Sequence, residues 1–212
     1  MFQHRLDAAE RLAPKLGHLH GHHPLVLAIP RGGVPMGRVM ADALQGELDV
    51  VLVRKIGAPG NPEYAIGAVS EDGSVHLEEE ARHCREEWLA DAIARQRELI
   101  AERRRRYTPV HQAIDPTGRT LVVVDDGCAT GATMAAALAT LRQRRPARLI
   151  AVLGVAPPHT AARLEGLADE VVCGAVPRHF AAVGQYFTEF DQVSDDEVVA
   201  LLAGNDGPPA SS

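Results

Sequence analysis

The chain has little of the chemistry that several large classes of protein need. Only three of its 212 residues are cysteine, at positions 84, 128 and 173, and no CxxC pair occurs. This argues against a disulfide framework and a thiolate zinc site, and it suggests a reducing compartment. The N-terminus has no apolar signal segment, and no apolar run approaches the ~20 residues of a membrane-spanning helix. We therefore expect a cytoplasmic protein with no membrane partner.

Positive charge is also in short supply. The 22 lysines and arginines are outnumbered by 28 acidic residues, which gives a formal net charge of −6. A general nucleic-acid binder needs a basic surface, so we expect no nucleic-acid partner. Only Lys15 and Lys55 are lysine. The hydrophobic fraction of 46% and the charged fraction of 24% are ordinary for a globular domain and exclude a fibrous or disordered chain.

Strand patterns alternate with helix patterns along most of the chain. Apolar runs predict strands at 25–29, 48–53, 120–124, 149–155 and 170–176, and periodic patterns predict helices at 2–16, 35–44, 78–106, 130–141 and 158–167. Such alternation is typical of a parallel sheet with helices on both faces. Two further short strands are expected within 65–77, and the glycine- and proline-rich stretch 57–63 predicts a loop.

The segment from 122 to 133 carries the most specific pattern, VVVDDGCATGAT. An apolar strand ends in Asp125 and Asp126, and a loop with two glycines and two threonines leads into a helix. Ligands bind at the carboxyl ends of parallel strands, and a helix N-terminus binds anions. The two acids would repel a phosphate, but they suit a ligand that also offers hydroxyls or a divalent cation, such as a ribose 5-phosphate. The alternative is an ordinary turn capped by Asp126.

This segment resembles the phosphoribosyl-diphosphate signature of type I phosphoribosyltransferases: an apolar strand, two acids, two variable residues and A-T-G-x-T. The resemblance covers about 25–176 and implies a Rossmann-like parallel sheet with a small hood. It implies that Asp125 and Asp126 are catalytic residues that hold the ribose hydroxyls and Mg²⁺, the ion through water and ligand oxygens. It also implies a loop around the donor's 5-phosphate, made by Gly127, Cys128, Ala129, Thr130, Gly131, Ala132 and Thr133.

The resemblance also implies a pyrophosphate site. Arg31, Gly32 and Gly33 follow the first core strand, where the family has its pyrophosphate loop. Arg54 and Lys55 end the next predicted strand and resemble the basic residues that contact pyrophosphate there, with Lys55 also assigned to catalysis. An ordinary glycine turn and a solvated strand end are the alternatives for these two segments.

The predicted loop at 57–63 matches the position of the family's mobile lid. Asn61, Glu63 and Tyr64 are its candidate residues. The loop has no lysine, unlike the orotate branch, so the identity of a catalytic lid residue stays open. Ala129 stands where the 6-oxopurine branch has an acid, which argues against a hypoxanthine-guanine enzyme.

Four domain segments are expected. Residues 1–23 contribute a helix to the hood, 24–176 form the core, 177–203 complete the hood, and 204–212 form a disordered tail. Four of the eight aromatic residues lie in the C-terminal hood segment, where they could stack on a base or form a small core of their own: Phe180, Tyr186, Phe187 and Phe190.

Two clusters outside the signature have simpler interpretations. The histidines at 18, 20, 22 and 23 lack acids or cysteines at firm spacing, so a solvated loop is favoured over a metal site. The arginines at 103–106 end a predicted helix and suit its dipole, so a solvated helix end is favoured over a phosphate or RNA patch.

The predicted activity is Mg²⁺-dependent transfer of the 5-phosphoribosyl group from phosphoribosyl diphosphate (PRPP) to a nitrogen nucleophile, in a homodimer. A nucleobase is the expected acceptor. One alternative is a regulatory protein that senses PRPP or a nucleotide without turnover. A hydrolase or phosphorylase that acts on phosphoribosyl compounds is another, because the same phosphate cradle would serve it.

Overall fold

The main body of the protein is a parallel sheet. The computed structural model describes residues 1–107 and 113–204, apart from the side chains of residues 62 and 63. Five parallel strands follow the order β2-β1-β6-β7-β8. Their bounds are Leu25–Ala28 (β1), Glu47–Val50 (β2), Thr120–Gly127 (β6), Arg148–Val155 (β7) and Glu170–Ala175 (β8). The predicted parallel sheet is confirmed.

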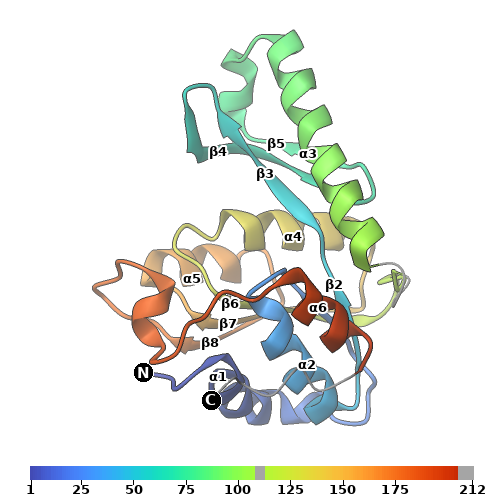
Figure 1. The fold of residues 1–212 in the computed structure, drawn as a ribbon, viewed down its shortest axis with the longest axis vertical. Coiled ribbons are helices and arrows are strands. Elements are labelled where there is room, and N and C mark those ends of the chain that lie inside the picture. Colours follow the sequence, from blue (N-terminus) through green and yellow to red (C-terminus); the bar gives the residue numbers. More distant parts are fainter. Residues whose placement is uncertain (108–112, 205–212) are drawn as a thin grey trace.

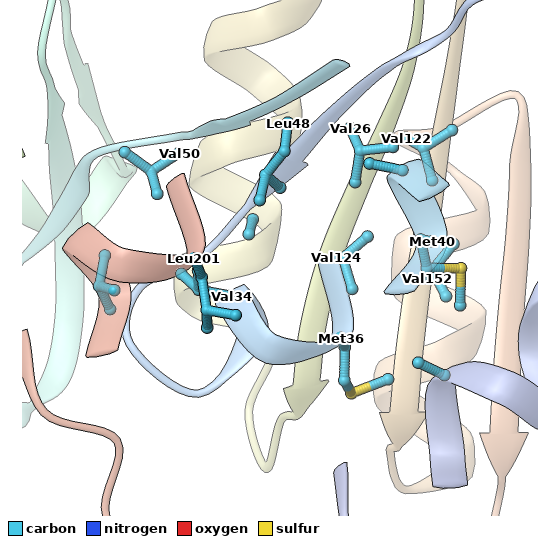
Figure 2. Packing of buried hydrophobic residues seen from close by; sticks show 14 of the residues in the cluster. Val26, Val34, Met36, Met40, Leu48, Val50, Val122, Val124, Val152 and Leu201 are labelled. Atoms are coloured by element: carbon cyan, nitrogen blue, oxygen red, sulfur yellow. The ribbon is translucent and has the colours of Figure 1, made fainter. Parts of the chain in front are cut away.

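Helices cover both faces of this sheet, because its strands are apolar on both sides. One face packs against α1 (Arg5–Leu12), α2 (Gly33–Leu44) and α6 (Asp195–Leu202), and the other against α4 (Ala132–Gln143) and α5 (Pro158–Glu165). Figure 2 shows Met36 and Met40 of α2 among the valines of the first face. The first helix is shorter than predicted, since a 3₁₀ helix follows it from Ala13 to Leu19.

A second unit stands away from the main sheet. It contains the antiparallel sheet of β3 (Val53–Ala58), β4 (Asn61–Ser70) and β5 (Val75–Leu77), followed by a 3₁₀ helix (Glu79–His83) and α3 (Glu86–Tyr107). Figure 1 shows α3 running along this small sheet from its far end back to the core. We call residues 53–107 the arm; it is a small hood drawn from the middle of the chain.

Three predicted elements differ from the structure in this region. The predicted strand at 48–53 is two strands in different sheets, because β2 ends at Val50 and β3 begins at Val53. The predicted loop at 57–63 is a hairpin in which Ala58 pairs with Asn61. One of its two glycines, Gly60, lies in the tight turn with φ of 77°. The predicted helix at 78–106 is also interrupted, since α3 starts only at Glu86.

The N-terminal residues meet the segment at 186–188 beside the core. The backbone N–H of Phe2 donates to the carbonyl of Tyr186 at 2.8 Å, and that of Thr188 donates to the carbonyl of Phe2 at 2.9 Å. The rings of Phe2 and Phe187 lie 5.5 Å apart, and those of Phe187 and Phe190 lie 5.0 Å apart. The C-terminal aromatics therefore pack on one another, as the small-core alternative expects.

The four domain segments stay predictions, and residues 205–212 of the expected tail lie outside the described residues. None of the helices in the described ranges is long and apolar enough to cross a membrane.

Candidate active site

The acid pair lies at the carboxyl end of β6, in the middle of the parallel sheet. The carboxylate of Asp126 is 11% exposed and accepts a hydrogen bond from Nε of Arg5 at 2.8 Å. Nη1 of Arg5 donates to the backbone carbonyl of Asp191 at 2.7 Å, and its guanidinium lies 3.9 Å from the centre of the Phe190 ring. Arg5 thus links the first helix and the segment at 190–191 to the acid pair. Sequence reasoning missed Arg5 because no local pattern marks it.

Both carboxyls are held where ionisation is disfavoured. Burial raises the pKa of Asp125 well above its usual range, and the negative charge of Asp126 raises it further. Burial also raises the pKa of Asp126, although Arg5 partly offsets the effect. A ligand that donates hydroxyl hydrogens to these oxygens, or a cation beside them, would favour the ionised pair.

The loop after β6 is held in place by two hydrogen bonds to neighbouring segments. The N–H of Cys128 donates to the carbonyl of Val155 at 3.0 Å. The buried hydroxyl of Thr160 donates to the carbonyl of Ala129 at 2.7 Å. Gly131 is the N-cap of α4 with φ of 71°, and a Cβ there would lie 2.6 Å from Cγ2 of Thr160. Gly131 has no side chain to cap the helix, although the N–H of Ala132 donates to Oγ1 of Thr130 at 3.4 Å. The N-terminus of a helix suits an anion.

Burial raises the pKa of Cys128 to about 12. This residue of the loop is therefore a thiol and offers no thiolate to a ligand.

The first glycine turn packs directly on the acid pair. Arg31, Gly32 and Gly33 connect β1 to α2, and the peptide bond between Pro30 and Arg31 is cis. A Cβ on Gly32 would lie 2.1 Å from Oδ2 of Asp126, and one on Gly33 would lie 2.5 Å from the carbonyl of Val124. Only glycine allows this approach, so the structure brings the predicted pyrophosphate turn and the predicted ribose acids together.

Arg54 reaches the same region from the arm rather than from the end of a core strand. It lies within β3, and its Nε donates to Oε1 of Gln96 on α3 at 2.8 Å. It lines a cavity of about 30 Å³ with Pro30 of the first turn and with Thr133, the last residue of the predicted phosphate segment, in the first turn of α4. Arg54 therefore stands between the two loops that the sequence analysis assigned to the donor.

Comparison with known proteins assigns the chain to a family. The model of the phosphoribosyl transferase domain matches residues 2–186. The chain belongs to the phosphoribosyl transferase family.

Similar proteins support this membership. Two Mycobacterium tuberculosis proteins, from strains CDC 1551 and H37Rv, are named only as candidate phosphoribosyl transferases; each is 43% identical over 213 residues, covering 95% of this chain. The match spans 46% of their length, so the chain corresponds to about half of these curated relatives. The crystal structure of TT1426 from Thermus thermophilus is 45% identical with a TM-score of 0.87, covering 97% of this chain and 99% of that one.

In this phosphoribosyl transferase domain, Lys55 and the lid residues lie on the arm. Successive side chains of a strand leave opposite faces, so Lys55 stands on the other face of β3 from Arg54. Asn61 begins β4 at the hairpin turn. The hydroxyl of Tyr64, a residue that is 49% exposed, donates to Oε1 of Glu80 at 3.1 Å. The side chain of Glu63 lies outside the described residues.

Of the two clusters outside the signature, the arginine run has ion-pair partners. Among the described residues, no three His, Cys, Asp or Glu side chains are grouped to hold a metal ion. The solvated helix end expected at 103–106 is wrong for Arg104, whose side chain is 13% exposed, whereas Arg106 is exposed at the end of the helix. Arg104 pairs with Asp49 and Glu71, and Arg106 pairs with Asp195 and Asp196. All of these acids are distant in sequence, so the arginine run itself gave no signal of them.

A larger cavity lies elsewhere and contains none of the signature residues. Its volume is about 440 Å³, and it adjoins the C-terminal half of α4 at Thr140, Leu141 and Arg144. Gly131 and the loop after β6 lie at the opposite end of that helix. A cavity of about 530 Å³ does include two predicted site residues, Tyr64 and Ala132. The candidate site is placed at the acid pair by the contacts of Asp126 with Arg5 and Gly32.

Replacing Gly32 with alanine tests the contact between the glycine turn and the acid pair. The new methyl group would push the Asp126 carboxylate away from Arg5. We expect destabilisation of about 1–3 kcal/mol, typical of overpacking. We also expect PRPP affinity to fall about 10–100-fold, as for a lost hydrogen bond to a charged group. Thermal unfolding and titration calorimetry measure the two effects.

Gly17→Ala is the matched control, because no atom lies within 4 Å of a Cβ at that position. Equal PRPP affinity in Gly32→Ala and the unaltered protein would contradict the assigned contact.

Proposed function

We propose that this domain transfers the 5-phosphoribosyl group from PRPP to a nitrogen nucleophile, with a nucleobase as the first candidate, and releases pyrophosphate. One observation carries the proposal. The Asp126 carboxylate lies against Gly32, so the acids assigned to ribose adjoin the turn assigned to pyrophosphate. The phosphate loop continues from the same strand on the other side. The three parts of PRPP then have adjacent binding groups in the order in which they are linked.

The chemistry needs positioning more than a protein nucleophile. The acceptor nitrogen forms a bond to C1 of the ribose, and the C1–O bond breaks with its electron pair leaving on pyrophosphate. The ribose passes through an oxocarbenium-like state, as in glycoside hydrolysis. Asp125 and Asp126 would accept hydrogen bonds from the ribose hydroxyls and hold C1 in line. Holding both reactants in this way accounts for a large part of such a rate enhancement.

The other assigned residues act on the two phosphate ends. Gly127 to Thr133 would bind the 5-phosphate through loop and helix N–H groups and two threonine hydroxyls. Arg31 and Arg54, with the N–H groups of Gly32 and Gly33, would bind the pyrophosphate. Lys55 and the hairpin residues Asn61, Glu63 and Tyr64 would act from the arm, whose closure would keep water from the ribose.

The two carboxyls of the acid pair are too few to hold Mg²⁺ alone, so the ion would also need oxygens of bound PRPP. Mg²⁺ usually binds one or two protein carboxylates and completes its shell with waters and substrate phosphates. The described residues offer two adjacent carboxyls and no cluster of three metal-binding side chains. We therefore propose that Asp125 and Asp126 contact the ion through water and donor oxygens. When bound, it would neutralise charge on the departing pyrophosphate. A homodimer in the cytoplasm stays a prediction.

Titration calorimetry with PRPP, with and without Mg²⁺, is the first test. Mg²⁺-dependent binding is expected, followed by pyrophosphate release in an assay against purine and pyrimidine bases. The control is the Asp125→Asn, Asp126→Asn double variant, which should neither bind PRPP tightly nor release pyrophosphate. Absence of PRPP binding to the unaltered protein would refute the proposal. Tight binding without release for any base would favour the sensor.

A further inference from the structure

The half-buried arginines divide into two groups. Eight arginines of the described chain are half-buried, and five of them form ion pairs: Arg5, Arg38, Arg104, Arg119 and Arg148. The other three are Arg31, Arg54 and Arg103. No carboxylate in the described ranges lies within ion-pair distance of any of these three, although the charge of Arg31 reaches Glu197 and helps to lower its pKa. A partly desolvated cation without a counter-charge is unfavourable.

These three arginines converge on one place. Arg54 of β3 and Arg103 of α3 line the same 30 Å³ cavity, whose wall includes Pro30, and Arg31 follows Pro30 in the chain. Arg31 and Arg103 also both act on the buried hydroxyl of Tyr107, since the charge of each lowers the pKa of that phenol against the larger effect of burial. The convergence therefore brings together a core loop and two elements of the arm.

The neighbourhood is electrostatically strained in the absence of an anion. The pKa of Arg54 is lowered by burial and also by the charge of Arg103. The only hydrogen-bond partner that the described residues give Arg54 is the neutral amide of Gln96. Two like charges that approach each other in a crevice between two phosphate-binding loops attract a polyanion. The planar guanidinium fork matches phosphate oxygens well.

We propose that Arg103 is a donor-binding residue, which with Arg31 and Arg54 forms a three-arginine site for the diphosphate group. The inference rests on the proposed function, since it assigns the diphosphate of PRPP to this place. Arg103 lies on α3, far along the chain from both the glycine turn and the signature loop. Two of the three cations belong to the arm, so the diphosphate would join the arm to the core.

The size of the cavity indicates where the ligand lies. A volume of about 30 Å³ is smaller than a diphosphate, so the ligand would lie at the opening of this cavity rather than wholly inside it. Once bound, the ligand would hold the arm against the glycine turn through Arg54 and Arg103. Closure of the arm over PRPP would then depend on the diphosphate group of PRPP rather than on its ribose 5-phosphate group.

The test is to titrate inorganic pyrophosphate and ribose 5-phosphate separately, by calorimetry, into the unaltered protein and into Arg103→Gln. We expect pyrophosphate affinity to fall about 10–100-fold, as for a lost charged hydrogen bond. Ribose 5-phosphate affinity should stay within about twofold, since its site does not include Arg103. Arg103→Lys should recover part of the loss, because it restores the charge without the fork. Arg95→Gln, at an exposed position on the same helix, is the matched control and should match the unaltered protein.

Several results would overturn the inference: unchanged pyrophosphate affinity in Arg103→Gln, an equal loss for both ligands, or no pyrophosphate binding by the unaltered protein. An equal loss would indicate a structural role, which the unfolding temperature of the variant would register as well. If ribose 5-phosphate and PRPP fail to bind while pyrophosphate binding depends on Arg103, the proposed function fails and the anion site stands.

Discussion

Replacing Asp125 and Asp126 together with asparagine is expected to lower kcat/KM for PRPP by about 10²–10⁴-fold without unfolding the protein. Each carboxylate is assigned a charged hydrogen bond to a ribose hydroxyl, and such bonds contribute about 1.5–3 kcal/mol apiece. Asparagine keeps the size of the side chain but lacks the charge. The fold should survive, because the amides replace groups that already resist ionisation in this place. Steady-state kinetics and thermal unfolding measure both halves of the prediction.

The single variant Asp125→Asn should be more stable than the unaltered protein at neutral pH. The folded-state pKa of Asp125 is raised, so the folded protein holds the proton more tightly than the unfolded chain. The free energy of unfolding therefore falls as pH rises from about 3.8 through the raised pKa, and it stays low above it. Asparagine does not ionise, so the variant avoids this decrease in the free energy of unfolding. Without Mg²⁺, the gain in Tm should grow with pH across that window.

The neighbouring variant provides an internal comparison. Asp126→Asn should gain less stability, because it leaves Arg5 without its carboxylate partner. An external control is Asp91→Asn with Glu98→Gln, which neutralises two exposed acids on α3 and should change neither kcat/KM nor the pH dependence of Tm. Turnover retained by the double variant at Asp125 and Asp126 would refute the assignment of the site.

The sequence predicted the signature strand and loop well because their chemistry is contiguous. The strand, both acids, both glycines and both threonines lie within 122–133, so one local pattern carries the strand, the turn and the start of the helix. The parallel sheet was predictable for a related reason, since strands buried on both faces are recognisable from short β-branched runs. In both cases the information lies within a dozen neighbouring residues.

The parts that the sequence did not predict depend on contacts between distant residues. Arg5 and Asp126 are 121 positions apart, and nothing near Arg5 distinguishes it from a surface arginine on an amphipathic helix. The arm was missed because the apolar run at 48–53 continues across the passage from one sheet to the other, and only the pairing partners separate its two halves. Arg103 belongs to a run of four arginines, and only the folded chain shows that Arg104 and Arg106 form ion pairs while Arg103 lines the cavity beside Arg54.

Asp49→Ala is expected to cause the largest loss of stability of any variant discussed, about 3–5 kcal/mol, as for removal of one partner of a buried ion pair. The Asp49 side chain is 2% exposed. Its oxygens accept hydrogen bonds from the N–H groups of Val50 and Ile114, at 2.7 and 2.8 Å, and from Nη1 of Arg104 at 3.3 Å. Alanine would leave these three donors without their acceptor.

The same network fixes the base of the arm to the core. Arg104 of α3 also pairs with Glu71, directly after β4, so two arm segments meet at Asp49 of β2. Burial alone would lower the pKa of Arg104, but its bonds to Glu71 and Asp49 raise it, so it stays charged. A loss of 3–5 kcal/mol corresponds to a Tm lower by about 6–20 °C in a protein of this size. Thermal unfolding measures this loss.

The control separates anchoring from simple loss of charge. Asp42→Ala removes an acid that also pairs with an arginine, Arg38, but this acid is 63% exposed. Its effect should stay below about 1 kcal/mol. Because Arg103 adjoins Arg104, Asp49→Ala should also weaken pyrophosphate binding at temperatures where the variant is still folded, whereas Asp42→Ala should not. If Asp49→Ala has the same Tm as Asp42→Ala, the anchoring role of Asp49 is contradicted. The small sheet alone would then hold Arg103 in place.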